Sequence, residues 1–138
     1  MSNLVRLSVS IDEPLYQRLE QMVAESGYAN RSEFFRDLIR SRLVEREWER
    51  DTEAVGTVTL LYDHAAHDLS SKLTHLQHHH HKAVLATTHV HLDERLCIEM
   101  ILVRGHAREI RRLADELGQQ KGVLHANLAI SSTGLDLA

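Results

Sequence analysis

The sequence predicts an α+β protein built from two parts of different character. Residues 5–11 alternate apolar and polar side chains, which is typical of a half-buried strand. The residues that follow carry apolar positions at helical spacing, and the rest of the chain alternates between strand-like and helix-like runs. These three observations predict a strand–helix–helix domain over residues 1–50, a charged linker over 51–54 and a second α+β domain over 55–138.

Composition limits the classes of protein to which the chain can belong. Its 138 residues are 43% hydrophobic but only 4% aromatic, so we expect a small core that gains stability from association of chains. One cysteine excludes an intramolecular disulfide framework, and no apolar run approaches the roughly 20 residues needed to cross a bilayer. We therefore expect a cytoplasmic protein without a membrane partner. The net charge of −4 does not advertise nucleic-acid binding, so a DNA contact must depend on where the positive groups lie.

The two helices of the first domain are predicted from their ends and their apolar stripes. Asp12 offers an N-cap and Pro14 lies in the first turn of a helix that ends at Gly27. Asn30, followed three residues later by Glu33, is the capping-box pattern of a second helix that continues to about residue 50. The apolar stripes are Leu15, Leu19, Met22 and Val23 in the first helix and Phe34, Phe35, Leu38 and Ile39 in the second.

The strand over residues 5–11 has no predicted partner in its own domain, and an unpaired strand leaves its backbone N–H and C=O groups unsatisfied. Pairing with the same strand of a second chain would form an antiparallel ribbon with Arg6, Ser8 and Ser10 on its outer face. A two-stranded ribbon fits the major groove of DNA, where arginine reads guanine and hydroxyls contact either base. The free N–H groups at residues 30–32 can hold a phosphate. The alternative is an edge strand whose polar face is only solvated.

The second domain carries strand and helix signals in a defined order. Strands are expected over 55–63, 84–92, 96–104 and 122–131, and helices over 66–81 and 106–121. The order β-α-β-β-α-β is the ferredoxin-like arrangement, in which the two middle strands form a hairpin.

The most informative segment of the chain contains a run of four histidines, two further histidines and the single cysteine. His89 and His91 lie two residues apart, so on a strand they point to the same side. If residues 93–95 turn a hairpin, Cys97 returns roughly opposite His91, at about 5 Å. Imidazole and thiolate suit late transition metals, and one ligand from the run would complete a four-coordinate site.

Each part of this pattern also has a simpler explanation. The run from His78 to His81 is compatible with an expression tag or a loose metal-binding tract. His89 and His91 are compatible with a polar strand face, and Cys97 with a small buried residue. Their occurrence together favours a specific metal site.

With these motifs the chain resembles the NikR family of nickel-responsive transcriptional repressors over nearly its whole length. The resemblance lies in the segment from Arg6 to Asp12, the segment from Gly27 to Asp37 and, most specifically, the spacing of Gln77-His-His-His-His81, His89-Val-His91 and Cys97. It implies a ribbon-helix-helix DNA-binding domain followed by an ACT-like domain that binds metal and forms tetramers.

The resemblance also implies the metal ligands. His89, His91 and Cys97 match the ligands that one subunit gives to a square-planar nickel ion, with one Ni²⁺ per subunit. His78 matches the ligand that a neighbouring subunit gives to the same ion.

Two further sets of residues match positions of the family. Arg6, Ser8 and Ser10 match the positions that read bases, although the two serines stand where threonines are expected. The carboxylates that match a second, harder cation site, for an ion such as K⁺, are Glu33 and Asp37, together with backbone carbonyls near Gly118, Gln120 and Val123.

The function implied is that of a homotetrameric repressor in which nickel promotes binding to a palindromic operator of nickel-uptake genes. One alternative keeps the fold and changes the metal to copper or zinc. Another is a metal store or chaperone that uses the histidine run. An enzyme is not expected, because the chain has no nucleophile–base motif or phosphate-binding glycine loop and four protein ligands leave no open metal position.

Overall fold

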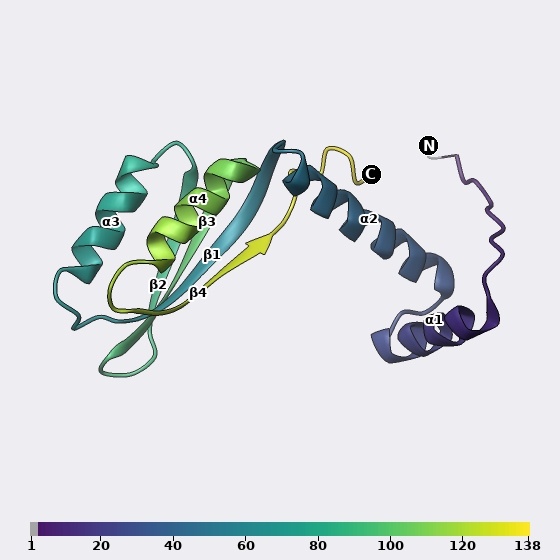
Figure 1. The fold of residues 1–138 in the computed structure, drawn as a ribbon, viewed down its shortest axis with the longest axis horizontal. Coiled ribbons are helices and arrows are strands. Elements are labelled where there is room, and N and C mark those ends of the chain that lie inside the picture. Colours follow the sequence, from purple (N-terminus) through teal and green to yellow (C-terminus); the bar gives the residue numbers. More distant parts are fainter. Residues whose placement is uncertain (1–2) are drawn as a thin grey trace. The chain divides into compact units, whose positions relative to one another are not determined.

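A computed structural model of the chain describes residues 3–138 (Figure 1). The described residues form helices and strands in the order α1, α2, β1, α3, β2, β3, α4, β4. They divide into two compact units, one that ends at Ile39 and one that spans Arg40–Ala138. Within this part of the chain, no helix has the length and apolar character needed to cross a membrane.

The helices of the first unit begin and end at the predicted signals. Helix α1 spans Glu13–Ser26, with Asp12 at its N-cap in an extended conformation and without a side-chain capping bond. It ends at Gly27, whose φ of +75° lies in the left-handed region that favours glycine. Helix α2 spans Arg31–Glu49, and the Asn30 Oδ1 accepts the Glu33 N–H at 3.0 Å, which is one half of a capping box.

The predicted strand over residues 5–11 is extended but unpaired. Within the described residues, 3–12 form no strand, because an isolated chain offers this segment no neighbouring backbone to bond with. Its apolar side chains are open to solvent, with Val5, Leu7 and Val9 exposed by 86%, 84% and 60%. The first unit therefore presents an apolar row that its own two helices do not cover.

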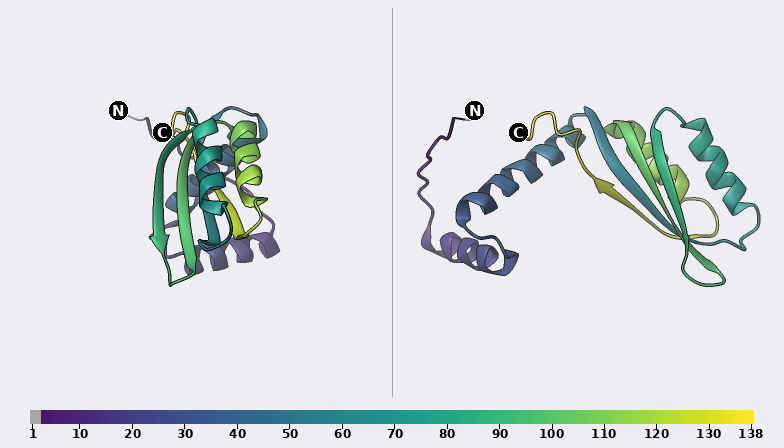
Figure 2. Two further views of the ribbon diagram at one scale, coloured as in Figure 1. Left: turned by 90° about the vertical axis from the view of Figure 1, so that its left-hand side faces the viewer. Right: turned by 180° about the vertical axis from the view of Figure 1, so that it is seen from behind.

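The second unit is one antiparallel sheet with two helices, in the strand order β2-β3-β1-β4 (Figure 2). The predicted ferredoxin-like fold is therefore confirmed. The strands are β1 (Glu53–Asp63), β2 (Val84–His91), β3 (Leu96–His106) and β4 (Val123–Ile130), and the helices are α3 (Leu69–His79) and α4 (Ala107–Gly118).

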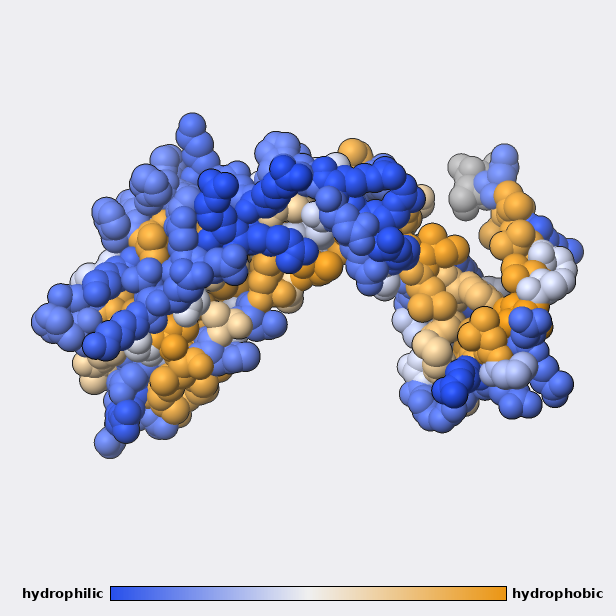
Figure 3. All heavy atoms as spheres, viewed as in Figure 1, coloured by the Kyte–Doolittle hydropathy of each residue, from blue (hydrophilic) through white to orange (hydrophobic). Residues whose placement is uncertain are grey.

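Alternation of side chains gives the sheet one buried and one open face. Val58, Leu60 and Tyr62 of β1 are buried with Ile101 of β3 and Leu113 of α4 in a single apolar core. The alternate positions of the same strands lie on the other face and include large exposed side chains. Examples are Met100 and Leu102 of β3 and Val90 of the neighbouring strand β2. Figure 3 is viewed from the side on which α3 and α4 lie, where hydrophobic atoms are visible between largely hydrophilic ones.

Helix α3 is shorter than predicted. It was expected over residues 66–81 but begins at Leu69, because the preceding residues form turns. The Asp63 C=O accepts the Ala66 N–H at 3.0 Å, and Asp68 has a φ of +58°, which is incompatible with a helix. The histidine run therefore straddles the end of the helix, with His79 as its last residue.

The end of α2 belongs to the core of the second unit. Trp48 is only 3% exposed, and its Nε1 donates to the Ser131 carbonyl at 2.9 Å. The Arg111 guanidinium lies 5.2 Å from the centre of the indole ring, within the range of a cation–π interaction. The boundary between the two units consequently falls inside α2.

Candidate metal centre

Three potential metal ligands meet on the β2–β3 hairpin. His89, His91 and Cys97 each offer one ligand atom, and these atoms lie within 4.8 Å of one another. The Cys97 Sγ lies 3.2 Å from the His91 Nδ1, and the two imidazole centres are 4.9 Å apart at an angle of 68°. Among the described residues, these are the three histidine, cysteine or acidic side chains that lie closely enough together to share one ion.

The register of the hairpin explains this arrangement. His91 pairs directly with Cys97, and His89 pairs with Glu99, so all these side chains lie on the face of the sheet that bears the helices. The predicted return of Cys97 opposite His91 is therefore observed.

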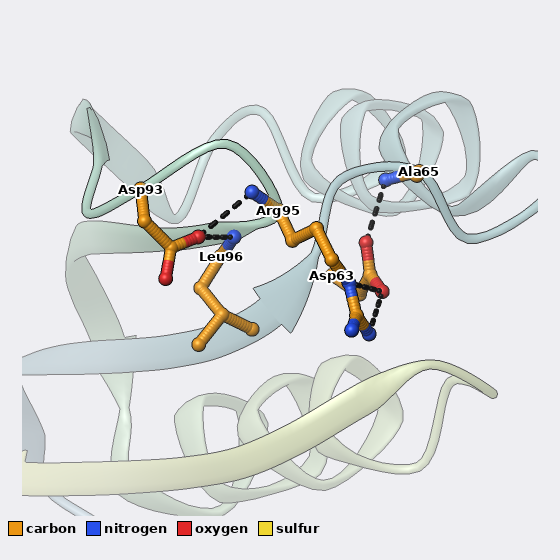
Figure 4. Close-up of polar contacts among 5 residues, drawn as sticks. All are labelled: Asp63, Ala65, Asp93, Arg95 and Leu96. Atoms are coloured by element: carbon orange, nitrogen blue, oxygen red, sulfur yellow. Dashed lines mark hydrogen bonds and ion pairs between the residues drawn. The ribbon is translucent and has the colours of Figure 1, made fainter.

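The turn between the two strands is held by a carboxylate (Figure 4). The Asp93 Oδ1 accepts the backbone N–H groups of Arg95 and Leu96, both at 2.7 Å. These two bonds lower the pKa of Asp93, with a smaller contribution from the Arg95 charge. The polar segment after His91 thus has a structural role, since it determines where the chain turns back toward Cys97.

A second carboxylate ties this turn to the end of β1. The Asp63 Oδ2 accepts two bonds from the Arg95 guanidinium, at 2.7 and 3.2 Å, and its Oδ1 accepts the Ala65 N–H at 2.9 Å. The hydrogen bonds from Arg95 and then Ala65 lower the pKa of Asp63. The hairpin tip is therefore fastened to a third strand.

Burial differs strongly among the three ligand candidates. Cys97 is completely buried, whereas His89 and His91 are exposed on the edge strand β2. Burial raises the pKa of the Cys97 thiol, and the nearby carboxylates of Asp63, Asp93 and Glu99 raise it further. Two imidazoles and a thiol that can become a thiolate are nevertheless a donor set that fits nickel, because a bound cation reverses this balance and favours the deprotonated sulfur.

His78 is not part of this group in the single chain. It lies exposed in the last turn of α3, beside Ser71, Thr74 and His75 along a shallow hollow. The next histidines have local partners: His80 Nε2 lies 3.2 Å from the Glu116 carboxylate, and His81 Nδ1 lies 3.3 Å from the His78 carbonyl.

Three polar residues that are linked to His89 through hydrogen bonds were not predicted from the sequence as part of the site. Tyr62 comes from β1, Glu99 from β3 and Gln77 from α3, and their side chains are linked by hydrogen bonds. Burial, followed by the charge of Glu99, raises the pKa of Tyr62 to about 12. The one sequence signal was alternation, since Glu99 stands at a core-facing position of a predicted strand where an apolar residue is expected.

The residues predicted to read DNA are all exposed. Arg6, Ser8 and Ser10 lie in the extended segment, alternating with its apolar row. Residues 31–33 at the start of α2 are exposed as well. Arg31 among them bonds to Glu20 of α1, with the Arg31 Nη2 at 3.1 Å from the Glu20 Oε2.

The two carboxylates of the expected second cation site lie one turn apart on α2. The Glu33 backbone is held by the Asn30 cap, and the Asp37 Oδ2 accepts a bond from the Tyr28 hydroxyl. That bond raises the pKa of Tyr28. Asp37 therefore has a neutral partner within the first unit.

Both parts of the chain match known protein families. Residues 5–46 match the family described as "Ribbon-helix-helix protein, copG family", and residues 55–131 match the "NikR C terminal nickel binding domain". A protein of Geobacter sulfurreducens, named "Putative nickel-responsive regulator", is 52% identical over 138 residues and 99% of each chain. Proteins with the same name are 46% identical in Dictyoglomus turgidum, over 95% of this chain and 98% of that one, and 42% identical in Caldanaerobacter subterraneus, over 99% and 90%.

A solved structure shows the same fold at low identity. An uncharacterized protein from Thermotoga maritima superposes with a TM-score of 0.51 at 16% identity, covering 56% of this chain and 96% of that one. This likeness concerns the fold alone.

A ribbon-helix-helix domain joined to a nickel-binding domain defines a transcription regulator that binds DNA and responds to a metal, and not an enzyme. The chain belongs to the NikR family of nickel-responsive regulators.

The first prediction concerns the turn between β2 and β3. Asp93→Ala removes the acceptor of two backbone N–H groups, so the hairpin tip should loosen and nickel affinity should fall about tenfold, which corresponds to about 1.4 kcal/mol. Nickel titration, followed by the change in absorption on metal binding, measures this loss. Glu94→Ala, in the same turn, is the matched control, and equal affinities of the two variants would contradict the role of Asp93.

A second prediction concerns acid stability. Because the pKa of Asp63 is lowered on folding, its contribution to stability is present above the ordinary value near 3.8 and is lost as the pH falls through the lowered pKa. Asp63→Asn should therefore unfold at lower urea concentration than wild type at pH 7, and the two curves should converge in acid. Asp115→Asn, an exposed carboxylate on α4, is the control. A difference that persists unchanged into acid would rule out this linkage.

Proposed function

We propose that the protein is a nickel-activated repressor whose metal-loaded form binds a palindromic operator of nickel-uptake genes. The observation that carries this proposal is the convergence of His89, His91 and Cys97 on one hairpin, in a domain of the nickel-binding family. These three residues would hold one Ni²⁺ per chain, and a bound ion would supply fixed positive charge and a preference for planar coordination.

The fourth ligand in this proposal is His78 of a neighbouring chain. In the single chain His78 is exposed and stands outside the group of three ligands, so it is available to another copy. The uncovered apolar face of the sheet supports association of the second units, because exposed side chains such as Val90, Met100 and Leu102 gain free energy when another copy buries them. The proposed assembly is a homotetramer of ACT-like domains.

The DNA-binding element would be a ribbon of two chains. Pairing of residues 5–11 across two copies satisfies their backbone and buries the row of Val5, Leu7 and Val9. The alternate side chains Arg6 and Ser8 then face outward, where they can enter a major groove. A pair of chains has twofold symmetry, and twofold symmetry in the protein calls for a palindrome in the DNA.

Coupling between the two activities would come from His78. When it joins the group of three ligands it ties α3 of one chain to the hairpin of another, and this favours arrangements of the tetramer that are competent for DNA. A hundredfold effect on DNA affinity requires about 3 kcal/mol of coupling, a realistic allosteric magnitude. Deprotonation of Cys97 on metal binding makes the response dependent on pH.

We further propose that Glu33 and Asp37 contribute to a second site for a hard cation such as K⁺. Oxygen donors suit such ions better than they suit nickel. Their spacing of one helical turn on α2 supports this role. We also propose that the protein acts in the cytoplasm, where a thiol stays reduced and operator DNA is accessible.

The third prediction tests nickel gating. Duplexes are selected from a random pool on the nickel-loaded protein, and the affinity for the best duplex is then measured by gel retardation with and without nickel. Nickel should raise the affinity about a hundredfold. Cys97→Ala should lose both this response and the nickel–thiolate band, whereas His67→Ala, which changes an exposed loop histidine, should keep both.

One outcome would overturn the metal switch, and another would change the metal to which it responds. Equal DNA affinity with and without nickel would exclude a metal switch. A stronger response to copper or zinc at matched free concentration would keep the switch and change its metal, which the order of metal affinities makes a necessary comparison.

The fourth prediction concerns Arg6. Arg6→Ala should weaken binding to the selected duplex by about 1–3 kcal/mol and relax the preference at one base pair, because a bidentate contact to guanine is lost. Nickel affinity should be unchanged, and Arg112→Ala on α4 provides a control of equal charge. A uniform loss across all sequences would instead indicate that Arg6 contacts phosphate.

A further inference from the structure

Glu99 is a buried acid at the centre of the second unit. The residue is only 8% exposed, and among the described residues it is the one buried residue that is polar or charged. Burying a carboxylate is costly unless it accepts hydrogen bonds. Glu99 accepts one such bond from each of two elements: the Gln77 Nε2 of α3 donates to its Oε1 at 3.3 Å, and the Tyr62 hydroxyl of β1 donates to its Oε2 at 3.5 Å.

The same tyrosine contacts a predicted metal ligand. The Tyr62 oxygen lies 3.1 Å from the His89 Nδ1, and the two rings meet edge to face at 6.0 Å. Glu99, Tyr62 and His89 therefore form a continuous chain of polar atoms that ends on the imidazole.

The direction of the bonds in this chain is determined by chemistry. A carboxylate oxygen accepts hydrogen bonds, and the Tyr62 hydroxyl donates its single proton to the Glu99 Oε2. The Tyr62 oxygen is then left as an acceptor toward His89, and the Nδ1 must carry the proton of the neutral imidazole. The lone pair of His89 consequently lies on Nε2.

The other carboxylate oxygen of Glu99, Oε1, also has a defined partner. The Gln77 amide cannot rotate freely, because its Oε1 accepts the Thr87 hydroxyl at 2.8 Å, which leaves its Nε2 to donate to Glu99. A helix and an adjacent strand therefore both orient the carboxylate that faces Tyr62.

From this geometry we infer that Glu99 is a positioning residue: acting through Tyr62, it fixes the tautomer of His89 that exposes Nε2 to the metal. A ligand histidine whose other nitrogen is held by a hydrogen bond binds metal more tightly, and loss of such a partner costs tenfold to hundredfold in affinity. The inference deepens the proposed nickel site and rests on it for its consequence, but the tautomer itself is a property of the metal-free protein.

The test compares wild type with Glu99→Gln and Tyr62→Phe. Long-range ¹H–¹⁵N correlation spectra of the metal-free protein, above the ordinary histidine pKa of about 6.5, report which nitrogen of His89 is protonated. Wild type should show the proton on Nδ1. In Glu99→Gln the new amide can donate to the Tyr62 oxygen, so the phenol can donate to His89 and the proton should move to Nε2. Glu94→Gln removes the same charge from the exposed turn and should leave His89 unchanged.

Nickel affinity provides the second measurement. Glu99→Gln and Tyr62→Phe should each lose tenfold to hundredfold. The double variant should lose no more than Tyr62→Phe alone, because without the phenol Glu99 has no path to His89. Additive losses would show that Glu99 acts independently of Tyr62 and would overturn the inference.

The remaining outcomes are equally decisive. A wild-type His89 protonated on Nε2, or a tautomer that Glu99→Gln leaves in place, contradicts the role of Glu99. If Glu99→Gln fails to fold in thermal unfolding, Tyr62→Phe alone tests the relay through the same spectra, since Nδ1 then loses its partner and both tautomers should be populated. Wild-type protein that shows the Nδ1 proton but binds no nickel would refute the proposed function and leave the tautomer assignment intact.

Discussion

Strand β3 is the constraint on which the rest of the second unit depends, because it pairs with β1 on one side and with β2 on the other. Tyr62, Cys97 and His91 consequently lie in one row across three strands. Glu99 and His89 lie together in the next row, one step along the sheet. A slip of one residue in either pairing would turn Cys97 to the opposite face, so metal binding and core packing depend on the same register.

Because of this register, the candidate metal site lies between two environments, the apolar core and the exposed edge strand. Cys97 projects into the apolar core, where burial disfavours the thiolate, whereas the imidazoles stand on the edge strand within reach of solvent. The network of Tyr62, Glu99 and Gln77 lies at the border between them. A charged residue is tolerated there because its two oxygens accept bonds from a strand and from a helix. The proposed ligand set therefore consists of a sulfur held by packing and nitrogens held by hydrogen bonds.

Two surfaces of the described residues lack a partner within the chain, and both do so for the same physical reason. Residues 3–12 are extended with unpaired backbone, and the outer face of the sheet exposes large apolar side chains such as Met100. Neither surface can be satisfied within one chain. Association of chains through both is what the proposed tetramer supplies, and His78, exposed at the end of α3, would then reach a site on another copy.

The sequence by itself determined most of the second unit and three of the ligand candidates. Period-two alternation and a polar turn were sufficient to place His89, His91 and Cys97 on one face, because strand geometry relates close neighbours along the chain. Local signals were also sufficient to predict that α1 ends at Gly27. They were not sufficient for the start of α3, where the turns after Asp63 interrupt a helical pattern.

Only the tertiary structure decided which polar groups surround the ligands. Tyr62, Gln77 and Glu99 belong to three elements separated by long stretches of sequence, and no periodicity relates them. Folding also decided that Trp48, at the end of a helix begun in the first unit, is anchored in the core of the second. The physical reason is the same in each case: alternation and caps are local properties of a chain, whereas the partners of a buried polar group are determined by how sheets and helices pack together.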